Sequence, residues 1–418
     1  MQRKRILIMK TYGKNALVGQ SGGPTAAINA SLSGVIAEWL EKQSGTLYGM
    51  ANGITGILDE RLYNLNEIFG GKKDALELLK LTPAAALGSC RKKLPTYEKD
   101  AGFYNELFGL FEKYEIGYFF YIGGNDSMDT VDKLSAYASA NGIDVKFVGI
   151  PKTVDNDLCG TDHTPGFGSA AKYVASVCAE TKRDTAVYTQ KAVTVIEIMG
   201  RDAGWLTASS ALAKTAYTDG PDLIYLPEVP FSFEQCFKDI EKCWESAPDV
   251  LIAVSEGIRD KDGNYVSADS TKKDTFGHAM LCGAANMLKN RVEEHFGCKV
   301  RAIELNTPQR AAGHCLSLTD INESFNVGVF GVREAIAGKT GIMAATVRIS
   351  DTPYEVKNES FPVCEIANKV KDVPREYINA EGNGITEAGL TYLRPLILGE
   401  CNPIYSDGVP KHYVFPKI

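Results

Sequence analysis

Four loops of the sequence combine glycine with acidic, basic or hydroxyl residues, and each follows a short apolar run. These loops are residues 19–29, 123–127, 151–157 and 199–201. Loops that end the strands of an open α/β sheet lie at the carboxyl edge of the sheet, where ligands bind. The four loops therefore predict ligand chemistry at such an edge.

The first two loops could hold an anion through their backbone. Gly22 and Gly23 let the main chain approach an anion closely, and the N-terminus of a predicted helix at 26–42 offers unpaired N–H donors. The loop has neither the Walker P-loop pattern nor G-x-G-x-x-G, so a simple turn is the alternative. In the second loop, Asp126 and Ser127 could be helix N-caps. Capping does not account for the two glycines that precede them.

The third loop carries the clearest chemical signal. Asp155 and Asp157 stand at i and i+2 beside Lys152 and Thr153. Such carboxylates can divide proton abstraction and magnesium positioning, as phosphoryl transfer to an alcohol requires. An Asx-rich turn is the alternative for the same residues. In the fourth loop, Arg201 follows a glycine and could bind a phosphate with two hydrogen bonds, although a surface salt bridge is the default for a lone arginine.

Apolar β-rich runs alternate with helical periodicity and would position these loops, which predicts a mainly parallel sheet covered by helices. We expect strands at 15–19, 117–122, 145–150, 192–198, 222–226, 249–255 and 300–305. We expect helices at 26–42, 127–141, 166–182, 203–214, 232–245 and 277–295. Residues 259–276 are polar and predict an exposed connection. From about residue 345 the alternation fades and prolines recur, which predicts a C-terminal extension that wraps the main body.

Composition narrows the function classes. The 418 residues are 44% hydrophobic and 23% charged, as in soluble globular proteins. The net charge of −7 argues against nucleic acid as a partner, and no apolar run is long enough to span a membrane. The start of the chain has too short an apolar run for a secretory signal. The 10 cysteines include no C-x-x-C pair, which predicts no zinc site, no disulfide framework and a cytoplasmic location.

Taken together, the order and spacing of the motifs resemble the phosphofructokinase family from about residue 15 to 330. The matching segments are Ser21-Gly22-Gly23, Gly88-Ser89-Cys90-Arg91, Gly124-Asn125-Asp126, Thr153-Val154-Asp155-Asn156-Asp157, Met199-Gly200-Arg201, Ser255-Glu256-Gly257, and Arg301 with Arg310. The resemblance implies an α/β fold of two doubly wound, mainly parallel-sheet domains with the active site in the cleft between them, plus the C-terminal extension. It implies a phosphoryl-donor domain (1–165 with about 310–345), a sugar-phosphate domain (166–309) and an extension (346–418).

The resemblance also implies roles for individual residues in the phosphorylation of fructose 6-phosphate at C1. Asp155 would be the general base, assisted by Lys152 and Arg201. The sugar phosphate would contact Thr153, Asp157, Met199, Gly200, Glu256, Arg301 and Arg310, of which the two arginines would hold the 6-phosphate. The phosphoryl donor would contact Gly22, Gly23, Arg91, Gly124, Asp126, Ser127 and Lys152. Mg²⁺ would be the cofactor, with Asp126 and Asp157 near it.

Two positions indicate which donor is used. ATP-using members of the family have glycine at the positions of Asp126 and Lys152, and pyrophosphate-using members resemble this chain. A carboxylate at 126 would repel the α-phosphate of a nucleotide, and an ammonium at 152 would attract pyrophosphate. Asn125 departs from an aspartate that contacts magnesium in many ATP-using relatives.

We therefore expect a pyrophosphate-dependent enzyme whose partners are fructose 6-phosphate and pyrophosphate, assembled as a homodimer or homotetramer. An ATP-dependent phosphofructokinase is the nearest alternative. A sugar-phosphate sensor without catalysis is another, but Asp155 and Arg201 are both present. NAD and lipid kinases share a similar Gly-Gly-Asp loop, although the Lys152–Asp157 motif is not expected in them.

Overall fold

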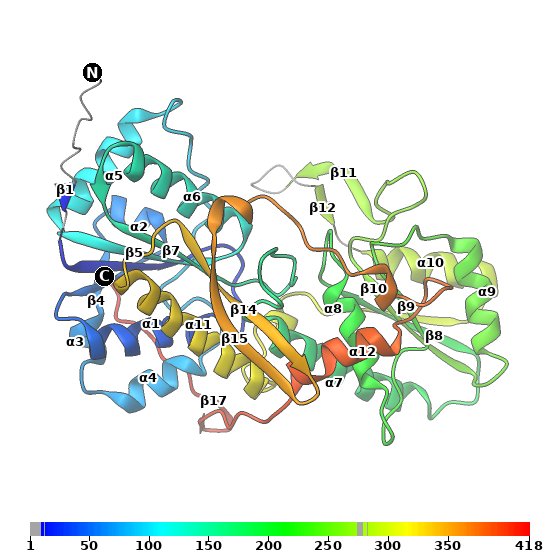
Figure 1. Cartoon of the computed structure of the whole chain (residues 1–418). Coiled ribbons are helices and arrows are strands. Elements are labelled where there is room, and N and C mark those ends of the chain that lie inside the picture. Colours follow the sequence, from blue (N-terminus) through cyan, green and yellow to red (C-terminus); the bar gives the residue numbers. More distant parts are fainter. Residues whose placement is uncertain (1–9, 12, 274–278, 282) are drawn as a thin grey trace.

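The computed structural model describes residues 10, 11, 13–273, 279–281 and 283–418. Figure 1 shows two lobes side by side, and each lobe is built around one main sheet. The N-terminal part of the chain forms most of the larger lobe. Residues from the middle of the chain form the smaller lobe, and the C-terminal part contacts both.

The larger lobe contains a seven-stranded sheet whose inner strands are parallel. In spatial order its strands are β15 (Tyr354–Pro362), β14 (Ile342–Asp351), β7 (Lys146–Pro151), β5 (Ile116–Gly123), β2 (Asn15–Gln20), β3 (Leu47–Met50) and β4 (Leu62–Asn64). Only the two outer pairs, β14–β15 and β3–β4, are antiparallel.

Helices cover both faces of this sheet because its central strands are apolar on both sides. Along β2, Leu17 joins one buried cluster, whereas Ala16 and Val18 join the cluster on the opposite face. Successive side chains of a strand point to opposite faces, and strands buried on both faces are typical of parallel sheets. One face carries α5 (Ala101–Lys113) and α6 (Asn125–Ala140), and the other carries α1 (Ile28–Lys42) and α11 (Leu318–Ile336).

The smaller lobe repeats the plan with a four-stranded, fully parallel sheet. Its spatial order is β13 (Lys299–Glu304), β8 (Ala192–Ile198), β10 (Asp249–Ser255) and β9 (Leu223–Tyr225). One face packs on α9 (Phe233–Cys243) and α10 (Ala284–Phe296). The other face packs on α7 (Phe167–Thr185), α8 (Trp205–Ser209) and the 3₁₀ turn η1 (Ser210–Ala213).

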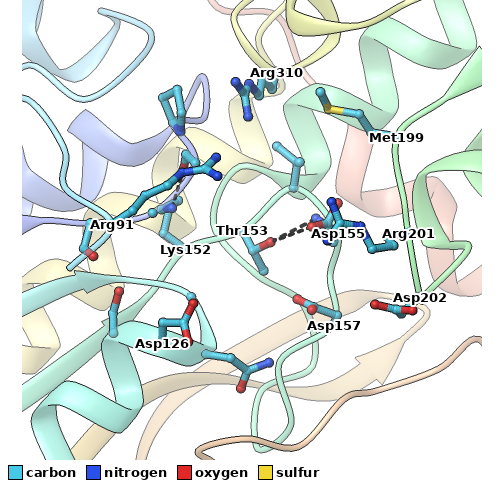
Figure 2. A pocket seen from close by; sticks show the side chains of 18 of the residues that line it. Arg91, Asp126, Lys152, Thr153, Asp155, Asp157, Met199, Arg201, Asp202 and Arg310 are labelled. Carbon is cyan, nitrogen blue, oxygen red and sulfur yellow. Dashed lines mark hydrogen bonds between the residues drawn. The ribbon is translucent and has the colours of Figure 1, made fainter. Parts of the chain in front are cut away.

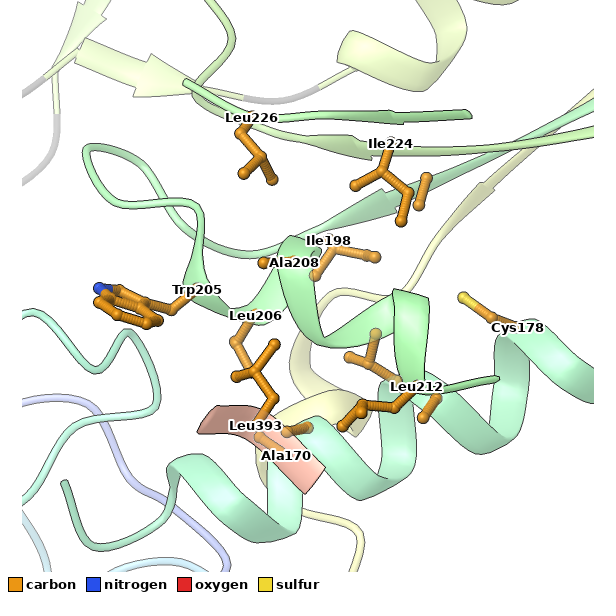
Figure 3. Packing of buried hydrophobic residues seen from close by; sticks show 14 of the residues in the cluster. Ala170, Cys178, Ile198, Trp205, Leu206, Ala208, Leu212, Ile224, Leu226 and Leu393 are labelled. Atoms are coloured by element: carbon orange, nitrogen blue, oxygen red, sulfur yellow. The ribbon is translucent and has the colours of Figure 1, made fainter. Parts of the chain in front are cut away.

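The cluster between this sheet and α7 includes residues from the C-terminal part of the chain. Figure 3 shows Ile198 and Ile224 above Leu206 and Leu212, with Ala170 of α7 below them. Leu393 of α12 (Glu387–Leu393) joins the same cluster and is buried. The C-terminal part is therefore integrated into the core of the smaller lobe.

After β15, the chain runs from the larger lobe across to the smaller lobe, forms α12 beside α7 and α8, and returns toward α1 (Figure 1). We call residues 363–373 of this path the crossing segment. The predicted start of a C-terminal extension at residue 346 falls inside β14, which pairs with β7 of the main sheet. The division of the chain into three parts remains a prediction.

Short elements complete the described chain. They are α2 (Ile54–Leu58), α3 (Leu65–Phe69), α4 (Lys73–Lys80), η2 (Thr307–Arg310), η3 (Val363–Glu365), η4 (Arg375–Tyr377), η5 (Arg394–Ile397), and the strand pairs β1 (Lys10–Thr11) with β6 (Ile143–Asp144), β11 (Ala268–Lys273) with β12 (Ala279–Leu281), and β16 (Tyr405–Ser406) with β17 (Val409–Pro410).

The predicted α/β class, with two mainly parallel sheets covered by helices, is confirmed. All seven predicted strands are present, each within one residue of its predicted bounds. The predicted helix 277–295 is observed from Ala284 to Phe296, and residues 277, 278 and 282 of the predicted range lie outside the described residues. Residues 1–9 and part of the polar stretch 259–276 also lie outside them. Within the described chain, no helix is both long and apolar enough to cross a membrane, and all nine described cysteines are free.

Candidate active site

A cavity of about 620 Å³ opens between the two sheets, at the carboxyl ends of their strands. Ser21, Gly124 and Lys152 are the first residues after β2, β5 and β7, and Met199 and Glu256 are the first after β8 and β10. The predicted site residues that line it are Gly22, Gly23, Arg91, Gly124, Asp126, Ser127, Lys152, Thr153, Asp155, Asp157, Met199, Arg201, Glu256 and Arg310. Figure 2 places Arg91, Lys152 and Asp126 on one side of Thr153 and Asp155, and Arg201 and Asp202 on the other.

The loop after β2 is tied to the segment that carries Arg91. The backbone N–H of Gly22 donates to the carbonyl of Cys90 at 3.2 Å, and the Ser89 hydroxyl donates to the carbonyl of Gly22 at 2.6 Å. Gly22 has φ 77°, a left-handed conformation that favours glycine. Gly22 and Gly23 line the cavity, whereas the first residue of α1, Ile28, does not. A role of the α1 N-terminus in anion binding stays a prediction.

The two glycines of this loop leave room for two cations. A Cβ atom on Gly22 would lie 3.4 Å from Lys152 Nζ, and one on Gly23 would lie 3.2 Å from an Arg310 nitrogen. Lys152 is buried, and its ammonium donates to the carbonyl of Gly23. Burial lowers the pKa of Lys152 to about 8, although the nearby Asp155 carboxylate opposes that shift. A loop of small residues thus permits a buried positive charge at this end of the cavity.

Helix α6 starts beside these cations, and it starts without a side-chain cap. Its first residue is Asn125 and its N-cap is Gly124, so Asp126 and Ser127 lie inside the first turn. The alternative interpretation of these two residues as N-caps is therefore wrong. The Asp126 carboxylate is 52% exposed and lies 3.7 Å from Lys93 Nζ. An acidic group in a first turn is stabilised by the helix dipole, and this one faces the cavity.

The loop after β7 holds the two central carboxylates. The Thr153 hydroxyl donates to Asp155 Oδ2 at 3.5 Å and accepts from the Asp155 backbone N–H at 3.2 Å. Burial raises the pKa of Asp155, against the opposing charges of Lys152, Arg201 and Arg310. Burial and the charge of Asp155 raise the pKa of Asp157 to about 7. A raised pKa makes a carboxylate a better proton acceptor near neutral pH.

The small sheet contributes the opposite wall. The backbone N–H of Gly200 donates to Glu256 Oε1 at 3.4 Å, and the Ser255 hydroxyl donates to the carbonyl of Gly200 at 2.5 Å. Burial, with Asp155 as the next cause, raises the pKa of Glu256 to about 7. A Cβ atom on Gly257 would lie 1.8 Å from the carbonyl oxygen of Arg201, so only glycine fits beside that arginine.

The two predicted phosphate-binding arginines are not brought together within this chain. Arg310 lines the cavity; burial lowers its pKa, and among the described residues its buried Nε has no hydrogen-bond partner. Arg301 lies on β13, the edge strand of the small sheet, and does not line the cavity. Its guanidinium lies 5.9 Å from the centre of the Tyr188 ring.

The cavity also contains residues that the sequence analysis did not select: Lys92, Lys93, Asp202, Asn368 and Val370. The two lysines follow Arg91 and Asp202 follows Arg201 in the sequence, so their places in the cavity could have been predicted from those neighbours. Asn368 and Val370 belong to the crossing segment, and no local pattern of residue types indicated that this segment reaches the cavity.

The donor atoms in the cavity suit a hard cation such as Mg²⁺, which prefers oxygen ligands and binds through one or two carboxylates and substrate phosphates. Asp126 and Asp157 both line the cavity. Asn125 also lines it, with a buried Oδ1 that has no hydrogen-bond partner among the described residues. The part of the chain that the structure describes contains no group of three or more His, Cys, Asp or Glu side chains arranged to hold a metal.

Comparison with known proteins points to one family. The family model for phosphofructokinase matches residues 15–332. A relative from Methylococcus capsulatus named pyrophosphate–fructose 6-phosphate 1-phosphotransferase is 41% identical over 403 residues, which cover 96% of this chain and 95% of the relative. A relative of the same name from Halomonas elongata is 41% identical over 401 residues, 95% of each protein. The crystal structure of a pyrophosphate-dependent phosphofructokinase from Marinobacter aquaeolei superposes with a TM-score of 0.85 at 37% identity, covering 96% of this chain and 95% of that one.

Proposed function

Since the chain belongs to the phosphofructokinase family, we propose that it transfers a phosphoryl group from pyrophosphate to the C1 hydroxyl of fructose 6-phosphate. The products are fructose 1,6-bisphosphate and phosphate, and the reaction is reversible. One observation supports this most directly. A single cavity holds the Asp155 loop together with Lys152 and Asp126, the two residues that distinguish pyrophosphate users from ATP users in the resemblance.

The proposed step needs a base and a cluster of positive charge. The C1 oxygen forms a bond to the transferred phosphorus as the bond from phosphorus to the bridging oxygen breaks. Asp155 accepts the hydroxyl proton, and phosphate leaves with the electrons of the broken bond. Such transfers depend mostly on positioning and charge neutralisation. Lys152, Arg201 and Arg310 all lie close enough to influence Asp155 electrostatically.

The remaining residues divide between the two substrates. Gly22, Gly23, Arg91, Gly124, Asp126, Ser127 and Lys152 would contact pyrophosphate. Thr153, Asp157, Met199, Glu256 and Arg310 would contact the sugar phosphate. Gly200 does not line the cavity and would act through its backbone hydrogen bond to Glu256. Arg301 does not line this cavity, and it would contribute to the 6-phosphate from a second copy of the chain, as in a homodimer or homotetramer. That assembly and a cytoplasmic location remain predictions.

The family consists of phosphotransferases, which generally use a divalent metal, and we propose Mg²⁺ here. When bound, it would neutralise charge on the phosphates. Asp126, Asp157 and Asn125 Oδ1 are the oxygen donors that would hold it. Removing divalent cations with a chelator should abolish turnover, and added Mg²⁺ should restore it.

The decisive experiment compares donors with purified protein, fructose 6-phosphate and Mg²⁺. Formation of fructose 1,6-bisphosphate from pyrophosphate, and the reverse reaction from fructose 1,6-bisphosphate and phosphate, would support the proposal. Efficient turnover with ATP and none with pyrophosphate would identify an ATP-dependent enzyme. Binding of fructose 6-phosphate without turnover of either donor would indicate a sugar-phosphate sensor.

A further inference from the structure

Asn156, between the two central carboxylates, has an unusual backbone conformation and a fully engaged side chain. Its φ is 54°, in the left-handed region, which is uncommon for residues other than glycine although asparagine adopts it more readily than most. The side chain is completely buried, and its Oδ1 accepts from the backbone N–H of Thr164 at 3.0 Å and from Lys371 Nζ at 3.3 Å. Its Nδ2 donates to the Tyr392 hydroxyl at 3.2 Å. Two of the three partners therefore come from the C-terminal part of the chain.

Lys371, in the crossing segment, contacts residues 156–162 through both the backbone and the side chain of the lysine. Its backbone N–H donates to the carbonyl of Asp157 at 2.8 Å. Its ammonium also donates to the carbonyls of Asp162 at 2.6 Å and Thr161 at 3.3 Å. Lys371 therefore contacts the main chain at Asp157, Thr161 and Asp162. It also contacts the side chain of Asn156.

Tyr392, in α12, supplies the other partner. Its hydroxyl accepts from Asn156 and donates to the carbonyl of Asp162 at 2.6 Å. The ring is held between neighbours, with the Trp205 ring at 5.1 Å and the Arg348 guanidinium at 4.4 Å. Because Tyr392 is buried in this packing, its hydroxyl has little freedom to move away from Asn156.

The crossing segment also contacts the loop that follows Arg201. The indole N–H of Trp205 donates to the carbonyl of Lys371 at 2.8 Å. Glu228 Oε1 accepts from the backbone N–H of Gly204 at 2.8 Å and from that of Val373 at 3.0 Å. The same short segment therefore binds the loops on both sides of the cavity.

We propose that Lys371 and Tyr392 are positioning residues for the phosphoryl transfer, an inference that rests on the proposed function. They hold Asn156 in its left-handed conformation, and this conformation directs the carboxylates of Asp155 and Asp157. A residue in a sparsely populated conformation persists only when its surroundings hold it there. Both residues lie beyond the 15–332 match to the family model, so this support comes from the C-terminal part of the chain.

The test uses one pair of substitutions and one matched control for each. Tyr392→Phe removes the hydroxyl and keeps the ring. Its control is Tyr377→Phe, which removes a hydroxyl from the ring that stacks on Tyr392, with the two ring centres 5.6 Å apart. Lys371→Met removes the ammonium. Its control is Lys369→Met, which removes the ammonium of an exposed lysine in the same segment. Lys371→Arg keeps a positive charge and hydrogen-bond donors at the site. For each variant, kcat and the KM for fructose 6-phosphate are measured with the better donor, together with the thermal midpoint.

We expect kcat to fall roughly 10–100-fold in Tyr392→Phe and Lys371→Met, as when supporting hydrogen bonds are removed or reacting groups are displaced. The KM for fructose 6-phosphate should change little, both controls should match wild type, and Lys371→Arg should recover part of the loss. A lower thermal midpoint with unchanged kcat would overturn the proposal, because the two residues would then only stabilise the fold. A raised KM with unchanged kcat would also overturn it.

These outcomes are separate from those of the proposed function. Wild-type turnover with pyrophosphate decides the donor, whereas the ratio of variant to wild-type kcat decides the positioning role, whichever donor is used. If Lys371→Met does not fold, Tyr392→Phe still decides the question, because it removes one oxygen atom and leaves the ring packing in place.

Discussion

The sharpest consequence of the site concerns Asp126, which we expect to exclude ATP. Replacing it with glycine removes both a carboxylate and its volume from the start of α6. We predict that Asp126→Gly raises the ratio of kcat/KM for ATP to kcat/KM for pyrophosphate. Measurable ATP activity should appear, but not efficient ATP use, because contacts to adenine and ribose would still be missing.

The exposure of Asp126 sets the size of the effect. Two unit charges 4 Å apart repel by about 1 kcal/mol in water and by about 4 kcal/mol at the effective dielectric of a protein surface. The side chain is 52% exposed and Lys93 lies 3.7 Å away, so the lower value is appropriate. About 1 kcal/mol corresponds to roughly a fivefold change in the ratio. Loss of the side-chain volume adds to this change in Asp126→Gly.

The assay measures kcat/KM for both donors in wild type, Asp126→Gly and Asp126→Asn. The asparagine variant keeps the volume and removes the charge, so the difference between the two variants isolates the steric part. Adding Lys152→Met should reduce pyrophosphate use much further, and the effects should not add, since both residues face one ligand. An unchanged donor ratio in both Asp126 variants would refute the reasoning and leave the donor assignment without its physical basis.

Three further predictions follow from the geometry of the site. Asp155→Asn should lower kcat by about 10²–10⁴-fold while calorimetry still detects binding of fructose 6-phosphate; a variant that kept more than about a tenth of wild-type kcat would point to another base. Glu256 has a folded-state pKa raised from 4.5 to about 7, so the folded state binds more protons than the unfolded state between these values, and stability falls as pH rises through this window. Glu256→Gln should therefore gain thermal stability relative to wild type from pH 5 to pH 8, by at most roughly 3 kcal/mol, whereas a constant difference across that range would contradict the assignment. Gly257→Ala would place a methyl group 1.8 Å from the carbonyl of Arg201, so kcat should fall in steady-state assays, while Gly263→Ala, at an open turn in the same lobe, should retain wild-type kcat.

Much of the fold could be predicted because buried strands have a strong local signal. The strands 192–198 and 249–255 match their predicted bounds, since ten of their fourteen residues are apolar and all except Ala192 are buried. The hairpin of β14 and β15 was not predicted. Glu355 and Lys357 of β15 are exposed, and the strand also contains Asn358 and Glu359, so its sequence resembles a polar connection. Its pairing partner, and not its own composition, makes it a strand.

The candidate site could also be predicted only in part. Loops that directly follow buried strands were found, because the end of an apolar run marks the sheet edge where ligands bind. Arg301 shows the limit of that reasoning. It lies within a matching motif, yet its strand is at the edge of the small sheet and its side chain lies against Tyr188. Whether a strand is central or at an edge depends on the order of pairing, which the local sequence does not contain.

Asn125 shows why a single departure from a family pattern has to be interpreted with its surroundings. Where many ATP-using relatives have an aspartate, this side chain donates through Nδ2 to the carbonyl of Lys369 at 3.1 Å. A carboxylate could not donate that hydrogen bond, and its oxygen would face the carbonyl oxygen at the same distance. The asparagine has a buried Oδ1 without a hydrogen-bond partner among the described residues, and its Nδ2 donates to the crossing segment. We therefore expect Asn125→Asp to weaken the contact between α6 and the crossing segment, and a thermal midpoint equal to that of wild type would contradict this reasoning.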